Sequence, residues 1–92
     1  MFRRGRLLHR DRIYSDEGFF VIPGKDWLVY SEDGKRMTIT VEMGRSGFAI
    51  YSETIGRWDD NPANSISNDE RKRIVANVTR ALESQGQSVI FI

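Results

Sequence analysis

Residues 67–86 read SNDERKRIVANVTRALESQG, and this stretch has the clearest helical pattern in the chain. Ser67 and Glu70 have the spacing of a capping box, in which each side chain accepts the backbone N–H of the other residue. Apolar residues then recur at helical period and form one stripe: Ile74, Val75, Val78, Ala81 and Leu82. Gly86 follows at a position where helices often end in the left-handed conformation. The stretch therefore predicts one long helix that buries a single face.

Most of the remaining sequence has the pattern of β-strands. Residues 36–43, RMTITVEM, alternate strictly between polar and apolar side chains. The apolar set is predicted to face the helix: Met37, Ile39, Val41 and Met43. Residues 27–31 precede this strand across a hairpin turn at Gly34, and residues 48–55 follow it as the next strand. Residues 19–22 form a further short strand.

The last five residues complete the predicted fold. Residues 88–92, SVIFI, are apolar without alternation, which predicts a strand that is buried on both faces. The expected fold class is α+β, with an antiparallel sheet of four to five strands and one long helix packed on one face. We expect residues 13–92 to form a single domain, and residues 1–12 to be a basic, flexible N-terminal segment.

The formal net charge of +1 conceals two regions of opposite sign. Residues 1–12 contain five arginines and one aspartate, whereas residues 13–92 contain nine Lys or Arg and twelve Asp or Glu. An acidic body favours a basic protein partner over nucleic acid, because phosphate binding needs clustered Lys and Arg. The sequence has no cysteine and no apolar run long enough for a membrane span or a signal peptide, so we expect a cytoplasmic protein.

Four acidic residues are candidates for a functional site: Glu42, Glu53, Asp59 and Asp60. Three interpretations stay open for them: a solvated strand face, a surface that recognises a protein, or a carboxylate pair for acid–base catalysis. No nucleophile, metal-ligand cluster or cofactor motif accompanies these acids. His9 is the only histidine, and it lies in the basic segment without other ligands at metal spacing. We therefore expect no enzymatic activity, no metal and no cofactor.

Residues 56–66 form a loop with one large aromatic residue, Trp58. Two interpretations of Trp58 stay open. It is a partner-binding residue, since Trp is enriched at binding hot spots, or an anchor that fixes the loop to the sheet. Trp27 lies within a strand and is predicted to be core. The partner-binding candidates are Glu42, Glu53, Trp58, Asp59 and Asp60.

Three segments resemble a small immunity-protein family of bacterial polymorphic toxin systems, which include contact-dependent growth inhibition. They are residues 27–43 (WLVYSEDGKRMTITVEM), 55–62 (IGRWDDNP) and 66–74 (ISNDERKRI). The resemblance covers residues 13–92. It implies a cytoplasmic protein without enzymatic activity, which binds a cognate toxin domain and blocks its active site or the access of substrate. Many such toxins are nucleases with basic surfaces, and the resemblance carries over Glu42, Trp58 and Asp59 as interface candidates.

Other features of the chain support two alternatives. In the first, the basic N-terminal segment and the run Arg71, Lys72 and Arg73 bind nucleic acid or the ribosome. A solvated helix face is the simpler interpretation of that run. In the second alternative, the apolar strand of residues 88–92 joins two copies of the chain in a homodimer.

Overall fold

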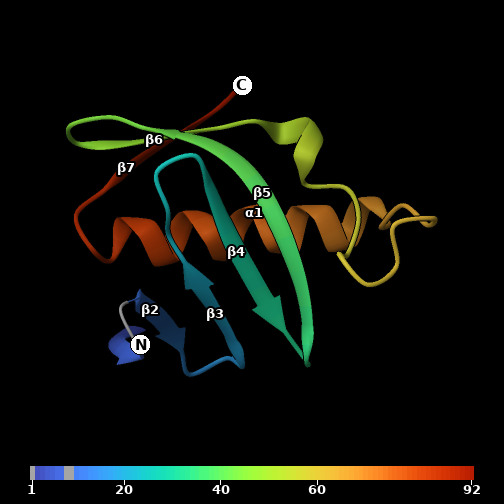
Figure 1. Cartoon of the computed structure of the whole chain (residues 1–92), viewed down its shortest axis with the longest axis horizontal. Coiled ribbons are helices and arrows are strands. Elements are labelled where there is room, and N and C mark those ends of the chain that lie inside the picture. The colour runs from blue at the N-terminus through green and yellow to red at the C-terminus, as the bar shows by residue number, and fades with distance from the viewer. Residues whose placement is uncertain (1, 8–9) are drawn as a thin grey trace.

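In the computed structural model, which describes residues 2–7 and 10–92, seven strands form one sheet and one long helix lies against one of its faces (Figure 1). The strands are β1 (Phe2–Leu7), β2 (Arg10–Ser15), β3 (Phe19–Ile22), β4 (Trp27–Glu32), β5 (Lys35–Met43), β6 (Gly47–Ile50) and β7 (Ser88–Phe91). The helical elements are the short 3-10 helix η1 (Ser52–Thr54) and the helix α1 (Asn68–Glu83). The α+β class agrees with the prediction.

The sheet is mixed rather than antiparallel, and it has more strands than predicted. β1 to β6 follow one another as an antiparallel meander, but β7 pairs with β6 in parallel. The parallel pair arises because α1 carries the chain back along the sheet between β6 and β7. The prediction of four to five antiparallel strands was therefore wrong in strand number and in the direction of the last strand.

The N-terminal part of the chain adds a hairpin to the sheet. β1 and β2 pair from Phe2 opposite Ser15 to Leu7 opposite Arg10, so the boundary expected after residue 12 falls inside β2. The sequence did not reveal this hairpin because its residues have neither a period of two nor a helical period. His9 lies outside the described residues, and the flexibility of residues 1–12 stays a prediction.

Both predicted ends of α1 are present. Ser67 Oγ accepts the backbone N–H of Glu70 at 3.1 Å, and Glu70 Oε1 accepts that of Ser67 at 3.3 Å. At the other end Gly86 has φ = +80°, and the N–H groups of Gly86 and Gln87 close the last turn in the pattern of a Schellman motif. The helical stripe is buried against the sheet as predicted, with Val75 only partly covered: Ile74, Val78, Ala81 and Leu82.

The core lies between α1 and the face of the sheet that α1 covers. β5 shows the predicted alternation, since Met37, Ile39 and Val41 are buried while their polar neighbours are exposed. Met43 is 49% exposed because it is the last residue of β5, beside the turn to β6. Trp27 is 40% exposed, because it lies opposite Thr40 on the outer face of the sheet. The predictions that Met43 faces the helix and that Trp27 is core were therefore wrong.

The turn before β5 was predicted correctly, whereas the length of the strand after it was not. Asp33 (φ 49°) and Gly34 (φ 76°) form the turn before β5, and a pair of left-handed residues matches the twist of a two-residue hairpin. The strand after β5 is shorter than predicted. β6 ends at Ile50 rather than at residue 55, because the chain coils into η1, where Thr54 N–H donates to Tyr51 C=O at 3.0 Å.

The last strand lies at an edge of the sheet. β6 lies on one side of β7, and the described residues supply no strand on the other side. Val89 and Phe91 pack partly against the core, whereas Ile90 is 60% exposed. The prediction of burial on both faces was therefore wrong, because α1 covers only one face of β7.

Candidate partner-binding surface

Residues 51–60 run along the part of β5 that has no neighbouring strand (Figure 1). β6 pairs with β5 only at residues 41–43, so the earlier part of that edge is open. Tyr51 N–H donates to Thr40 C=O at 3.0 Å, and Thr54 Oγ1 accepts Thr40 N–H at 3.0 Å. The segment thus satisfies backbone groups that an open sheet edge would leave unpaired.

Asp59 completes this edge with its backbone and its side chain. Its N–H donates to Arg36 C=O at 2.8 Å. Its Oδ1 accepts Thr38 N–H at 2.9 Å, and its Oδ2 accepts the Thr38 hydroxyl at 2.7 Å. The carboxylate takes the place of the carbonyl that a neighbouring strand would offer. Asp59, a predicted partner-binding residue, therefore also has a role within the fold.

The other three predicted acids lie along the same edge. The Tyr51 hydroxyl donates to Glu42 Oε1 at 2.5 Å, and this hydrogen bond raises the pKa of Tyr51 because the carboxylate favours the protonated phenol. Glu53 lies in η1 and Asp60 follows Asp59, and both are exposed. Neither carboxylate forms an ion pair or a hydrogen bond with the described residues. Together the four residues are termed the acidic ridge: Glu42, Glu53, Asp59 and Asp60.

Trp58, the fifth predicted residue, points into the core beneath the acidic ridge. Its side chain is 6% exposed, and its ring centroid lies 6.2 Å from that of Tyr30. The Lys35 ammonium lies 4.6 Å from the ring centroid, which is a cation–π contact. Trp58 thus lies where an anchor for the loop is needed, and it fixes the backbone immediately before Asp59.

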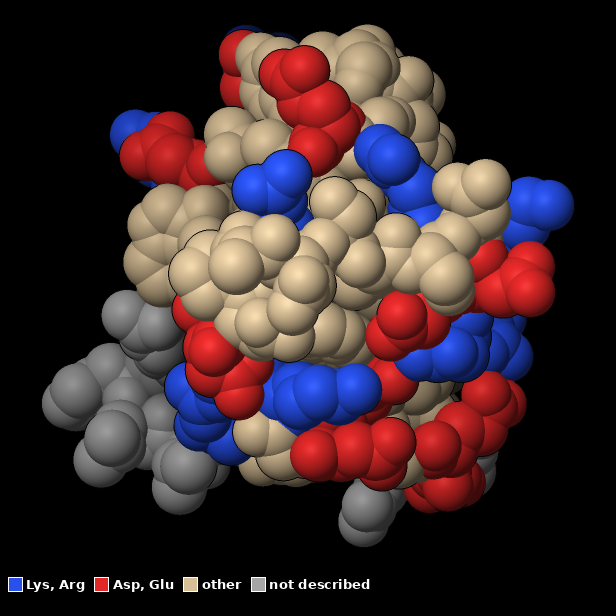
Figure 2. Space-filling model, turned by 90° about the vertical axis from the view of Figure 1, so that its right-hand side faces the viewer, with Lys and Arg blue, Asp and Glu red and all other residues tan. Residues whose placement is uncertain are grey.

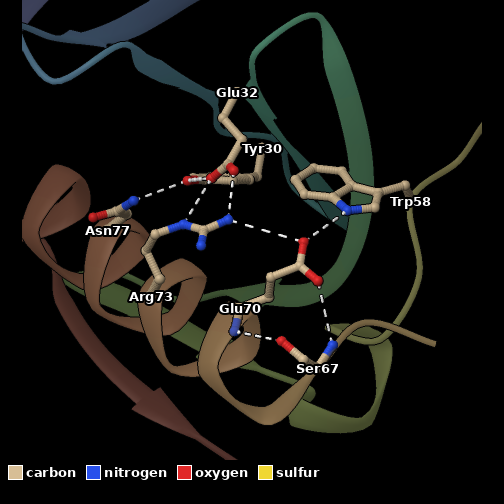
Figure 3. Close-up of polar contacts among 7 residues, drawn as sticks. All are labelled: Tyr30, Glu32, Trp58, Ser67, Glu70, Arg73 and Asn77. Atoms are coloured by element: carbon tan, nitrogen blue, oxygen red, sulfur yellow. Dashed lines mark hydrogen bonds and ion pairs between the residues drawn. The ribbon is translucent and has the colours of Figure 1, made fainter.

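Glu70 connects this anchor to the start of α1 (Figure 3). One of its carboxylate oxygens completes the capping box with Ser67. The other accepts Trp58 Nε1–H at 3.4 Å and lies 3.9 Å from Arg73 Nη2. The capping box that the sequence predicts therefore also positions the loop, because the same side chain contacts both.

A buried polar cluster that the sequence analysis missed joins α1 to the sheet (Figure 3). Asn77 Nδ2 donates to the Tyr30 hydroxyl at 2.9 Å, and that hydroxyl donates to Glu32 Oε1 at 2.6 Å. Arg73 donates two hydrogen bonds to Glu32, at 3.3 and 2.5 Å. Asn77 could have revealed this cluster in the sequence, because it is a polar residue on the apolar face of the predicted helix and a buried amide requires hydrogen-bond partners.

These contacts shift the pKa values of the groups involved. Burial and the hydrogen bond to Glu32 raise the pKa of Tyr30. Burial alone would raise the pKa of Glu32, but the hydrogen bonds from Tyr30 and Arg73 outweigh it and hold that pKa below its ordinary value. Arg80 donates two hydrogen bonds to Glu17 and lowers its pKa. Two ion pairs, Arg73–Glu32 and Arg80–Glu17, therefore hold α1 to two turns of the sheet.

The two ion pairs border a hollow of about 620 Å³ between α1 and these turns. Its charged lining is balanced: Glu17, Glu32, Asp33, Lys35, Arg73 and Arg80. Figure 2 shows the end of the molecule that lies to the right in Figure 1, where acidic and basic side chains are interspersed around an uncharged area. The lining of the hollow therefore has no excess of one charge that would select a ligand.

The basic run at the start of α1 is largely engaged within the fold. Arg71 Nη2 donates to Ser52 C=O at 2.5 Å, and Arg73 binds Glu32. Lys72 is exposed. Because two of the three cations already contact the protein, the arrangement does not favour the nucleic-acid alternative.

The described residues contain no group of three or more His, Asp or Glu side chains that could hold a metal ion. None of the helices in this part of the chain has the length and apolar character required to cross a bilayer. Two exposed features are candidates for recognition: the acidic ridge beside the tethered segment of residues 51–60, and the open edge of β7.

The region from β4 to β7 holds the acidic ridge, Trp58 and the polar cluster, and it is the region that a known family shares. The family model described as Immunity protein 74 matches residues 25–92. The chain belongs to this family. No curated protein sequence and no solved structure gave a match.

Membership of the Immunity protein 74 family confirms the predicted resemblance to an immunity-protein family. It also makes a toxin the class of protein partner to expect. The matched range begins just before β4, so β1, β2 and β3 precede it, whereas every residue of the acidic ridge lies inside it.

Proposed function

We propose that this protein binds a cognate toxin domain in the cytoplasm and neutralises it. The toxin belongs to a polymorphic toxin system or a contact-dependent growth inhibition system. Membership of the Immunity protein 74 family is the observation that carries this proposal. The toxin is a nuclease with a basic substrate-binding surface. The protein performs no chemistry, and it acts by covering the active site of the toxin or the path of the nucleic acid toward it.

The acidic ridge is the proposed docking surface. Glu53 and Asp60 are exposed and have no intramolecular ion pair among the described residues, so their charge is available to a basic partner. Glu53 and Asp60 lie on the segment of residues 51–60. The contacts of Glu42 with Tyr51 and of Asp59 with Thr38 fix this segment against β5. A surface that is already ordered loses little conformational entropy on binding, which favours tight association.

Trp58 supports the ridge from the protein interior in this proposal. Its buried ring holds the loop before Asp59 and leaves little surface for a partner. Tyr51 is the aromatic side chain that lies on the ridge itself, beside Glu42, and it is half-buried. Tyrosine at such a position is suited to provide a hot spot, while the carboxylates accelerate and orient the encounter.

The charge of the ridge is tested by the association rate with the toxin domain, which we expect at the C-terminus of a large secreted protein encoded beside this gene. We expect the double variant Glu53→Lys, Asp60→Lys to associate about tenfold more slowly at low salt, and this difference to shrink as salt screens the charges. Asp26→Lys, Glu83→Lys is the matched control, because it makes the same charge change at two exposed positions that are not among the four ridge residues. Equal rates for the two variants would contradict the ridge as the docking surface.

A further inference from the structure

The two edges of the sheet differ in how they are protected against pairing. The sequence of β1 contains three arginines and a glycine: Arg3, Arg4, Gly5 and Arg6. β7 contains no charged residue, no proline and no glycine. Natural sheet edges are usually protected by charge, by proline or by a bulge. β7 has neither charge nor proline, which indicates that its open edge pairs with a further strand.

The hydrogen bonds to β6 define which backbone groups β7 offers on that edge. Ser88 N–H donates to Ser46 C=O at 3.0 Å, and Ile92 N–H donates to Ile50 C=O at 2.8 Å. Alternate residues of a strand direct their backbone groups to opposite sides. Val89 and Phe91 therefore direct their N–H and C=O groups away from β6, toward the edge that has no neighbour in the described part of the sheet.

The side chains of β7 alternate in the same way between the two faces. Val89 and Phe91 pack partly against the core beneath α1. Ile90 and Ile92 lie on the other face and are among the most exposed large apolar side chains of the described residues. A strand added at this edge would extend both the core layer and the outer apolar stripe.

We propose that β7 pairs antiparallel with β7 of a second copy of the chain, about a two-fold axis at Ile90. Val89 then lies opposite Phe91 of the second copy, and the two pairs exchange their free N–H and C=O groups in four hydrogen bonds. Ile90 meets Ile90 of the second copy in the closely spaced, non-hydrogen-bonded position on the outer face. The two sheets become one continuous sheet across the dimer.

Charge favours a second copy as the occupant, and the hydrogen-bond phase of β7 permits one. The outward groups of Val89 and Phe91 are two residues apart, so one axis midway between them satisfies all of them at once. No charged side chain lies on β7 or on β6, so two copies meet without like-charge repulsion. Two-fold pairing also closes the assembly, because the β7 edge of each copy is fully occupied by the other copy.

Cysteine cross-linking tests the pairing and its register, because the sequence has no cysteine of its own. Facing residues of a non-hydrogen-bonded pair have Cβ atoms about 4.5–5.5 Å apart, close enough for a disulfide to form with a small adjustment. We expect Ile90→Cys to form a disulfide dimer roughly tenfold faster than the exposed loop variant Ser65→Cys, because pairing raises the effective thiol concentration. Ser88→Cys is the register control, since Ser88 faces Ile92 of the second copy rather than itself.

Charge substitution at Ile90 gives an independent test. Ile90 is mostly exposed, so Ile90→Lys and Ile90→Glu should fold, which circular dichroism verifies. In sedimentation equilibrium from about 10 µM to about 1 mM, we expect the natural chain to dimerise, each variant to stay monomeric, and a mixture of the two to dimerise again.

Three outcomes would overturn the proposal. The first is a natural chain that stays monomeric across this range, with Ile90→Cys cross-linking no faster than Ser65→Cys. The second is a monomeric chain whose affinity for the toxin falls on the Ile90→Lys change, which would assign the edge to a toxin strand. The third is a dimer that Ile90→Lys leaves intact. None of these measurements depends on the acidic ridge, so the dimer and the proposed function can fail separately.

Discussion

The carboxylate of Asp59 accepts both the backbone N–H and the hydroxyl of Thr38, a residue 21 positions earlier in the chain. Asp59 N–H in turn donates to Arg36 C=O. A loop residue therefore supplies the acceptors that a missing strand would have given to β5. Because Asp60 and Glu53 lie on the same tethered segment, this contact couples the stability of the fold to the position of the charges proposed for recognition.

Removing the Asp59 side chain should cost measurable stability. We expect Asp59→Ala to lower the free energy of unfolding by about 1–3 kcal/mol, because two hydrogen bonds to Thr38 are lost at a sheet edge. Asp60→Ala should stay within about 0.5 kcal/mol of the natural chain, since the Asp60 carboxylate has no partner among the described residues. Urea unfolding followed by circular dichroism measures both. An Asp59→Ala variant as stable as Asp60→Ala would show that the contact does not hold the edge.

Trp58 offers a way to separate an anchor from a contact residue. Trp58→Ala should destabilise the fold by about 3–5 kcal/mol, because it empties a buried site beside Tyr30. Trp58→Phe keeps an aromatic ring in that site. We expect it to bind the toxin with unchanged affinity, whereas a direct hot-spot contact would lose about 2 kcal/mol or more. Calorimetric titration of folded Trp58→Phe with the toxin domain decides between these roles.

Local sequence patterns predicted the parts of the fold that local physics determines. The capping box at Ser67 and Glu70, the left-handed Gly86 and the turn at Gly34 each depend on a few neighbouring residues, and all three are present. Burial was harder to predict, because it depends on what covers each face. Ile90 and Trp27 are apolar residues in strands, yet α1 covers only the opposite face of the sheet, and both are exposed.

The candidate surface shows the same limit. The sequence singled out the four acids of the ridge and Trp58 as partner-binding candidates, and this role stays a prediction. It did not indicate that Asp59 pairs with Thr38, or that Asn77 meets Tyr30 from 47 residues away. Such contacts depend on which distant segments the fold places side by side, and the local periodicity of a sequence does not contain this information.

The buried contact between Tyr30 and Asn77 can be tested with a double-mutant cycle. Tyr30→Phe leaves the Asn77 amide without one partner, and we expect a loss of about 1–3 kcal/mol. Asn77→Leu removes the same hydrogen bond from the other side. The double variant should lose less than the sum of the two, with a coupling of about 0.5–3 kcal/mol. Strictly additive losses in urea unfolding would mean that the two side chains do not act together.

Glu32 should make stability depend on acid pH. Its pKa is lowered in the folded state, so the unfolded chain binds its proton first as the pH falls below the ordinary value of 4.5. The stability that Glu32 contributes is thus present above 4.5 and is lost as the pH falls through its lower folded-state pKa. We expect the stability gap between the natural chain and Glu32→Gln to narrow from about pH 6 to about pH 3.

The matched control for this titration is Glu53→Gln, because Glu53 is an exposed carboxylate that has no partner among the residues the structure describes. The free energy of unfolding of this variant should stay within about 0.5 kcal/mol of that of the natural chain. The midpoint of urea unfolding, measured across this pH range, is the observable. A constant gap between the natural chain and Glu32→Gln would show that Tyr30 and Arg73 do not stabilise the ionised carboxylate.

The most direct test of the central claim is growth rescue in bacteria. The toxin domain, which we expect at the C-terminus of a large secreted protein encoded beside this gene, is induced alone, with this protein, and with its Glu53→Lys, Asp60→Lys or Asp26→Lys, Glu83→Lys variant. The account predicts that the domain alone stops growth. The natural chain and the Asp26→Lys, Glu83→Lys control should restore growth and co-purify with the domain. The Glu53→Lys, Asp60→Lys variant should restore growth less well. The account would be contradicted if the domain were toxic but this protein neither restored growth nor co-purified with the domain.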